Sequence, residues 1–283
     1  MEKINISEWE ELHNNFEDFL EGKKKGTIVL AEPVADITVW YGNQSPYSLI
    51  SGLSKPEIDK VVYYTGWLVT DAGETGLAEG SVLSEQEYKE AMEKYGRSSF
   101  SAGQGAAAVD AFIKKFDAKA ICRELRKKEI EQMQKLEKFY DEDPEEGWED
   151  KAACYRAELA DVRARIDAAV FLCKNPDSFL IREITLFPLQ LRAMLRELSG
   201  STPYGVLNDL DSLYGSVASR VSRLKRLKEI DAPEIILRNE SRILQENVDA
   251  LLANGMRGEA KTKGDGHALF CLGDVLTRSI KVF

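Results

Sequence analysis

The feature that most constrains the fold is a helical pattern over residues 208–255 that is interrupted once. The interruption is at Asp231 to Pro233 in the "IDAPE" stretch, because proline disfavours helix in the residue before it yet suits the first turn of a new helix. Asn208 or Asp209 is expected to cap the first helix, and Gly255 to end the second. Each arm holds about 20 residues, or roughly 30 Å. The apolar residues of the first arm keep close to a seven-residue repeat, which indicates a coiled-coil-like seam: Leu210, Leu213, Val217, Leu224 and Leu227.

Several arginines on this hairpin are not explained by its core. At 100° per residue, Arg220, Arg223 and Arg226 step from the edge of the apolar stripe around to its back. On the second arm, Arg238 and Arg242 lie one turn apart and face away from the apolar residues. The pattern therefore predicts a basic flank.

Two further polar residues of the second arm lie on an apolar side. Glu240 and Asn247 share the side of Ile236 and Ile243, where a polar group needs a hydrogen-bonding partner. Their partners are not identified by the spacing.

The charge of the hairpin contrasts with that of the chain, whose formal net charge is −10. Between Arg220 and Glu246 there are seven basic residues against five acidic ones, a net of +2, which leaves −12 for the remainder. One interpretation is a solvated hairpin with internal ion pairs, such as Arg242 with Glu246. The other is a surface for a protein partner with an acidic groove, which the small net charge favours over a phosphate backbone.

The remaining sequence predicts both helices and strands. Dense β-branched residues around Pro33 indicate short strands. A helix is expected from Lys55, with Pro56 in its first turn, and another after the capping box of Ser84 and Glu87. Small antiparallel sheets are expected near 27–42, 61–71 and 178–187.

Two more helical segments are predicted. Residues 5–20 form a short amphipathic pattern, and the charged stretches on either side of "DEDPEEGWED" predict an antiparallel helical hairpin over 106–174. The seam of this hairpin is expected to join Leu125, Met133 and Leu136 to Leu159, Val162, Ile166 and Ala169.

Composition excludes several classes of protein. No run of about 18 apolar residues is present, and the start of the sequence is acidic, so neither a membrane span nor a signal peptide is predicted and a cytoplasmic location is expected. The four cysteines have no C-x-x-C spacing, so we expect no disulfide, no metal site and no cofactor in this chain.

At the hairpin the sequence closely resembles the clamp helices of β′, the largest catalytic subunit of bacterial RNA polymerase. The similar stretch is "DLDSLYGSVASRVSRLKRLKEIDAPEIILRNESRILQENVDALLANGMRG". The segments "GTIVLAEPVADITVW", "GWLVTDAGETGLAEGSVLSEQEYKEAMEKYG" and "GQGAAAV" also resemble successive β′ segments in the same order.

The resemblance implies an α+β, predominantly helical, clamp-like fold, with small antiparallel sheets and two projecting antiparallel helical hairpins. Its expected parts are an N-terminal amphipathic helical segment at 1–25, a mixed α/β clamp body at 26–105 and 175–207, the helical hairpin at 106–174, the coiled-coil clamp helices at 208–255 and a rudder-like segment at 256–283.

In that family the hairpin is the chief docking site for region 2 of the sigma factor. The positions here that the resemblance assigns to sigma binding are Arg220, Arg223, Arg226, Arg238, Asn239, Glu240, Arg242 and Asn247. Asn247 stands where a small residue is usual, which bears on which sigma is accepted. The lid and rudder positions, which differ in sequence from the family's, imply a weak DNA or RNA contact near Ser201, Tyr204, Arg257, Lys261 and Lys263.

The chain also lacks parts of β′. The zinc-ribbon cysteines and the D-x-D-G-D motif that holds catalytic magnesium are absent, so we expect no nucleotidyltransferase activity from this chain alone; the pair "DLD" at 209–211 is attributed to helix capping. The first functional hypothesis is a non-catalytic clamp-like protein that binds a sigma factor and takes part in or regulates transcription. The alternative is a piece of a split or truncated β′ that assembles with other subunits into DNA-directed RNA polymerase. A plain helical scaffold is the third.

Overall fold

The computed structural model describes residues 26–141, 148–186, 203–264 and 266–275. These residues form two compact units, which are described separately here. One unit contains the described residues up to Ile37 and those from Ile181 onward, and the other runs from Thr38 to Leu180. The predicted helix over 5–20 lies outside the described residues.

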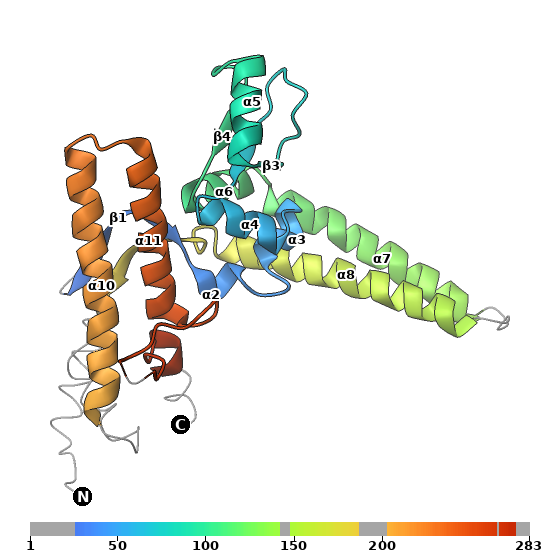
Figure 1. Cartoon of the computed structure of the whole chain (residues 1–283). Helices are drawn as coiled ribbons and strands as arrows, with labels where there is room; N and C mark the ends of the chain where they lie inside the picture. The colour runs from blue at the N-terminus through green and yellow to red at the C-terminus, as the bar shows by residue number, and fades with distance from the viewer. Residues whose placement is uncertain (1–25, 142–147, 187–202, 265, 276–283) are drawn as a thin grey trace, which may run out of the picture. The chain divides into compact units, whose positions relative to one another are not determined.

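The first unit is built around the predicted hairpin. Helix α10 (Pro203–Glu229) and helix α11 (Glu234–Ala253) stand side by side and run in opposite directions (Figure 1). Strands β1 (Thr27–Ala35) and β5 (Leu180–Thr185) pair in a two-stranded antiparallel sheet. Both helices contact β1, which passes behind them in Figure 1.

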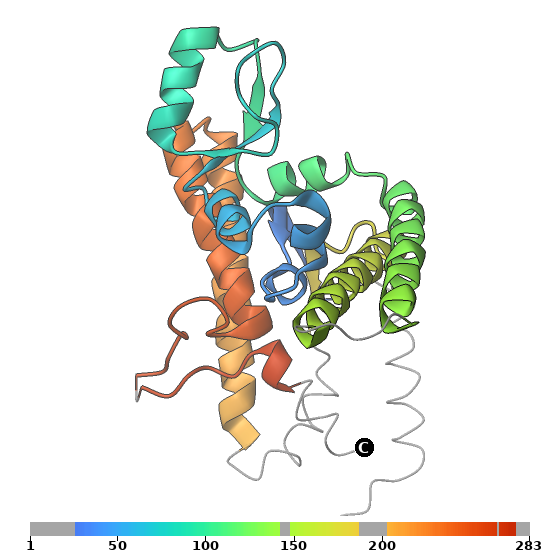
Figure 2. The same cartoon turned by 90° about the vertical axis from the view of Figure 1, so that its right-hand side faces the viewer.

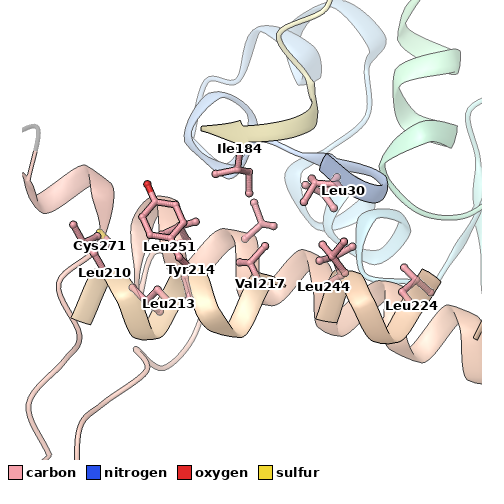
Figure 3. Packing of buried hydrophobic residues seen from close by; sticks show 14 of the residues in the cluster. Leu30, Ile184, Leu210, Leu213, Tyr214, Val217, Leu224, Leu244, Leu251 and Cys271 are labelled. Carbon is pink, nitrogen blue, oxygen red and sulfur yellow. The ribbon is translucent and has the colours of Figure 1, made fainter. Parts of the chain in front are cut away.

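The core of this unit is the seam that the repeat predicts. Leu210, Leu213, Val217 and Leu224 are each at most 1% exposed, and only Leu227 at the end of the series is half-buried. The four buried residues belong to one cluster with residues of α11 and of the sheet, and the burial of each such side chain contributes about 1.5–3 kcal/mol. The partners include Leu244, Val248 and Leu251 from α11, Leu30 from β1 and Ile184 from β5 (Figure 3).

The break between the two helices falls where it was predicted. Asp231 has a φ of 48°, which ends the helical path, and the Ala232 amide closes the turn by donating to the Leu227 carbonyl at 3.0 Å. Pro233 precedes the first residue of α11. The predicted start of the first helix is wrong: α10 begins at Pro203, so Asp209 lies in its second turn and does not cap it.

The second unit contains a three-stranded antiparallel sheet of β2 (Trp67–Asp71), β3 (Val82–Leu83) and β4 (Ser101–Gly103), in the order β3–β2–β4. Residue Trp67 of the central strand lies opposite Leu83, and Leu68 lies opposite Gly103. Two further helices, α5 and α6, follow β3 and β4 in sequence. The elements are α2 Ile37–Trp40, α3 Pro46–Ser51, α4 Lys55–Val62, β2 Trp67–Asp71, β3 Val82–Leu83, α5 Glu85–Tyr95, β4 Ser101–Gly103, α6 Ala106–Ile113, α7 Ala118–Asp141 and α8 Trp148–Lys174.

The predicted capping box of α5 is confirmed. The Ser84 hydroxyl accepts from the Glu87 amide at 3.2 Å, and the Glu87 carboxylate accepts from the Ser84 amide at 2.7 Å. These hydrogen bonds lower the pKa of Glu87, because they favour its charged form. Gly96 ends the helix with a φ of 85°.

Two strand predictions are wrong in part. Residues after Ala35 form α2 instead of a strand, and the spacing of three places Ile37 and Trp40 on one face of a helix, where both are fully buried. Val61 and Val62 end α4, so the strand begins only at Trp67. The sheets also differ from the single body expected for 26–105 and 175–207, because β1 and β5 belong to the unit of the hairpin.

Helices α7 and α8 lie side by side as an antiparallel hairpin (Figure 2). Leu125, Leu159 and Ile166 are buried as predicted, but Met133 is 47% exposed, so its place in the seam is wrong. The hairpin begins later than predicted, because α6 is a separate helix and Asp117 starts α7 by accepting from the amides of residues 119 and 120, both at 3.0 Å. None of the helices in the described ranges is both long and apolar enough to cross a membrane.

Gly105, in the "GQGAAAV" stretch, is expected to be sensitive to substitution. Its φ is +79°, and a Cβ there would lie 2.5 Å from the Tyr64 hydroxyl. Gly105→Ala should therefore lower the free energy of unfolding by about 2 kcal/mol, measured by urea unfolding with tryptophan fluorescence. The control is Gly42→Ala, where a Cβ would meet no atom within 4 Å; equal effects of the two changes would contradict the prediction.

Candidate interaction surface of the hairpin

One face of the α10–α11 hairpin is covered by β1. The Lys225 ammonium donates to the Val29 carbonyl at 3.3 Å, and Lys228 pairs with Glu32 at 2.8 Å. On α11, the buried Gln245 exchanges two hydrogen bonds with the backbone of Ala35, at 2.7 and 2.8 Å. Lys225, Lys228 and Gln245 therefore mark the covered face.

The opposite face, which we call the open face, carries the predicted arginines of α10. The helical rotation places Arg220, Arg223 and Leu227 on the side of α10 away from β1, and Ile236 and Ile243 on the matching side of α11. Ile230, just beyond the last residue of α10, continues this side. The open face is thus defined by six residues: Arg220, Arg223, Leu227, Ile230, Ile236 and Ile243.

Glu240 holds the arginines of the open face in place. Its side chain is 3% exposed, and its two carboxylate oxygens pair with Arg220 Nη1 at 3.0 Å and Arg223 Nε at 2.9 Å. The Arg223 side chain remains 62% exposed, so its guanidinium is fixed at one end and accessible elsewhere. This is the partner that the position of Glu240 required. Because Glu240 is buried, it orients the surface and does not itself reach the solvent.

Arg226 lies at the edge of the open face. It is exposed, and no ion pair of Arg226 is found among the described residues. The basic edge therefore combines two arginines oriented by Glu240 with one that is unconstrained.

The arginines of α11 lie on another side of the hairpin. Arg242 is three residues from Gln245, and so lies nearer the covered side. Arg242 pairs with Glu246 at 2.5 Å and donates to Asn239 at 3.0 Å, which confirms the predicted internal ion pair. Arg238 lies 3.7 Å from Glu234. The structure therefore brings together Arg220, Arg223 and Glu240 but does not bring Arg238, Asn239 and Arg242 onto the same face.

An apolar tip adjoins the basic edge, and the sequence analysis missed it as part of the surface. Ile230 is 65% exposed, Ile235 71% and Ile236 44%. Large apolar side chains gathered and exposed in this way mark an interaction surface more often than scattered ones. The sequence contained a sign of this tip, because three isoleucines lie around the helix break at positions outside the heptad-like seam.

Asn247 connects the hairpin to the segment that follows it. Its side chain is 7% exposed, its amide donates to the Ile243 carbonyl at 2.6 Å, and its oxygen accepts from the Lys261 ammonium at 2.6 Å. Burial lowers the pKa of Lys261, although the nearby Glu246 opposes this shift. Asn247 thus supports the rudder-like segment instead of lying open on the surface.

The rudder-like segment is anchored at its base by two side chains. Asn254 bonds the backbone of Lys261 and of Leu269, at 2.8–2.9 Å. Asp209, which is 1% exposed, pairs with Lys263 at 2.7 Å and accepts from the Phe270 amide at 3.2 Å. The expected capping role of Asp209 is therefore replaced by a tertiary one.

These contacts bear on the five positions expected near nucleic acid. Lys261 and Lys263 already have partners in Asn247 and Asp209, and Arg257 is half-buried with a partner of its own. Ser201 lies outside the described residues, and for Tyr204 only its place in the first turn of α10 is described. The described ranges contain no cluster of three histidine, cysteine or acidic side chains that could hold a metal ion.

Comparison with known proteins identifies the family of the chain. The family model described as "RNA polymerase Rpb1, domain 1" matches residues 15–276. The chain belongs to this family. Similar relatives are the DNA-directed RNA polymerase subunits beta' of Alkaliphilus oremlandii, with 36% identity over 254 residues, and of Symbiobacterium thermophilum, with 35% over 254 residues. A third is that of Clostridium botulinum, with 35% identity over 254 residues.

Each of these Rpb1-family alignments covers 90% of this chain but only 20% of the relative. The chain therefore spans about one-fifth of the length of the subunits that it matches. The resemblance to the β′ clamp region drawn from the sequence is confirmed, because the matched residues include β1, both hairpins and the rudder-like segment.

Proposed function

We propose that this chain is a non-catalytic, clamp-like member of the Rpb1 domain 1 family that binds region 2 of a sigma factor through the open face of its α10–α11 hairpin. The observation that carries the proposal is the pairing of Arg220 and Arg223 with the buried Glu240, beside an exposed apolar tip. Two oriented guanidinium groups next to isoleucines suit a partner with carboxylates beside apolar side chains.

The oriented arginines supply specificity more than bulk attraction. An arginine whose guanidinium is held by a buried carboxylate loses little conformational freedom on binding, so more of its interaction energy appears as affinity. The small net charge of the hairpin supports a protein partner, since binding to a phosphate backbone relies on many unpaired cations. Lys261 and Lys263, which are paired within the chain, contribute little to such binding.

The test is binding of purified sigma region 2 to the full chain, with Arg223→Glu combined with Arg226→Glu. Reversing two charges at the edge of the interface should weaken the affinity by about tenfold to a hundredfold, because like charges then face each other. The matched control is Lys135→Glu with Lys138→Glu, two exposed positions on α7, and it should change the affinity less than twofold. Equal affinity of both variants and the unmodified chain would overturn the proposal.

A second candidate function is that of one piece of a split or truncated β′, assembling with other chains into DNA-directed RNA polymerase. It is favoured by the alignment of nearly the whole chain with a fifth of each relative. Affinity purification from the host separates the two candidates. Recovery of the remaining polymerase subunits in equal amounts supports assembly, whereas recovery of sigma without them supports the first candidate.

A further inference from the structure

The open face is uncovered among the described residues, yet it has the chemistry of a surface that another helix covers. Ile230 and Ile236 are 65% and 44% exposed, and they lie beside Arg223 and Arg226. A surface of this kind, apolar with one basic edge, fits an amphipathic helix that carries apolar residues on one side and carboxylates on the other.

Such a pattern is present in the chain's own sequence, at residues 5–20. Trp9, Leu12, Phe16 and Phe19 recur at spacings of three and four, which places them on one side of a helix. The same stretch contains no lysine or arginine but carries five acidic residues, at positions 8, 10, 11, 17 and 18. The charge of the segment is thus opposite to that of the basic edge.

The chain path brings this segment within reach of the open face. The residues from 21 to 26 connect it to β1, and six extended residues span at most about 20 Å. Near the start of β1, the Val29 carbonyl is bonded by Lys225, which lies four residues before the end of α10. A helix has a diameter of about 10 Å, so the connection is long enough to pass around α10.

The lengths also agree. As a helix, sixteen residues would be about 24 Å long. The ten-residue interval from Arg220 to Ile230 covers about 15 Å along α10 at the same rise. A helix formed by residues 5–20 would therefore be long enough to cover both the basic edge and the apolar tip.

We infer that the acidic amphipathic segment at residues 5–20 docks on the open face of its own hairpin, with its carboxylates against Arg223 and Arg226 and its aromatic residues against Ile230 and Ile236. Its docking would make the segment an internal competitor of any external partner. This regulatory consequence rests on the proposed sigma binding; the docking itself does not.

The docking is tested with a photoreactive benzoylphenylalanine at Phe16 in the full chain. Illumination should cross-link position 16 within the same chain to residues 220–243, located by mass spectrometry. The charge-reversal pair Arg223→Glu and Arg226→Glu should reduce the yield at least fivefold. Lysine substitutions at Glu10, Glu11 and Glu17 in the same chain should then restore it. Neutralising Glu131 and Glu137 on α7 serves as the control and should leave the yield unchanged.

Three outcomes would overturn the inference. These are cross-links that avoid residues 220–243, cross-links formed only between chains and lost on dilution, and a yield that does not respond to the arginines. Sigma binding is measured separately. If the segment covers the face nine-tenths of the time, replacing its five acidic residues with amides should tighten the apparent Kd for sigma region 2 about tenfold.

The two proposals fail in different ways. A chain that cross-links as described but does not bind sigma retains the docking and loses the proposed function. A chain that binds sigma with no cross-link to the open face retains the function and loses the docking.

Discussion

Glu240→Ala is expected to lower the free energy of unfolding of the hairpin by about 2–3 kcal/mol. The side chain is 3% exposed and accepts ion pairs from Arg220 and Arg223. Removing one partner of a buried pair costs several kcal/mol, because the remaining charge is left without compensation. The value here is smaller, since the Arg223 side chain is 62% exposed and water replaces part of the lost contact.

The same change should weaken binding of sigma region 2 by about tenfold, although Glu240 is not itself at the surface. Without the carboxylate, Arg220 and Arg223 lose the contact that orients them. Their side chains must then be ordered when sigma binds, and this entropy loss reduces the free energy of binding. Binding is measured by isothermal calorimetry at a temperature where the variant remains folded. Glu229→Ala, at an exposed position at the end of α10, is the control.

A double-mutant cycle separates orientation from simple loss of charge. If Glu240 acts through Arg223, then Glu240→Ala should have a smaller effect on binding in the presence of Arg223→Ala than in its absence, by about 1 kcal/mol or more. Strictly additive effects would show that Glu240 does not act through this arginine.

Leu244→Ala is expected to cause the largest loss of stability, about 3–4 kcal/mol. Leu244 is fully buried and belongs to the cluster that joins α11 to the seam of α10 and to Leu30 of β1 (Figure 3). Removal of a buried leucine side chain loses the burial energy and leaves a cavity that the surrounding helices fill only in part. Both helices and the sheet should be destabilised together.

The measurement must report on the unit that contains the hairpin. The three tryptophans of the described residues, Trp40, Trp67 and Trp148, all lie in the other unit, so tryptophan fluorescence is not suitable. Amide hydrogen exchange of α10 and α11 should show faster exchange in Leu244→Ala, by two orders of magnitude or more if exchange occurs through unfolding of the unit. Ile235→Ala, at a position 71% exposed, should leave exchange almost unchanged.

The local features of the fold could be predicted because they depend on residues close together in the sequence. The seam of α10 follows from a seven-residue repeat, the turn from Pro233, and the start of α5 from Ser84 and Glu87. In each case the interacting groups are within one or two helical turns of each other. The failed predictions also have local reasons. The α2 residues have the apolar content of a strand, and periodicity alone does not show whether a short apolar run is a helix or a strand.

The candidate site was predicted in part. The sequence was sufficient to place Arg220, Arg223 and Arg226 on one flank and to show that Glu240 needed a partner. It did not identify that partner, because Glu240 and Arg220 are twenty positions apart and on different helices. Nor did it separate Arg238 and Arg242 from the open face, since this depends on which side of the hairpin β1 covers.

The sequence by itself thus determined that this chain forms a two-helix hairpin with a basic flank, because helix periodicity and the effect of proline act within a few residues. Only the tertiary structure decided which flank remains open, where the isoleucines of the tip meet the arginines, and that Asp209 binds the rudder-like segment. The physical reason is that burial and ion pairing depend on which surfaces meet. β1 reaches the covered face from nearly 200 residues away along the chain, and no local pattern encodes that contact.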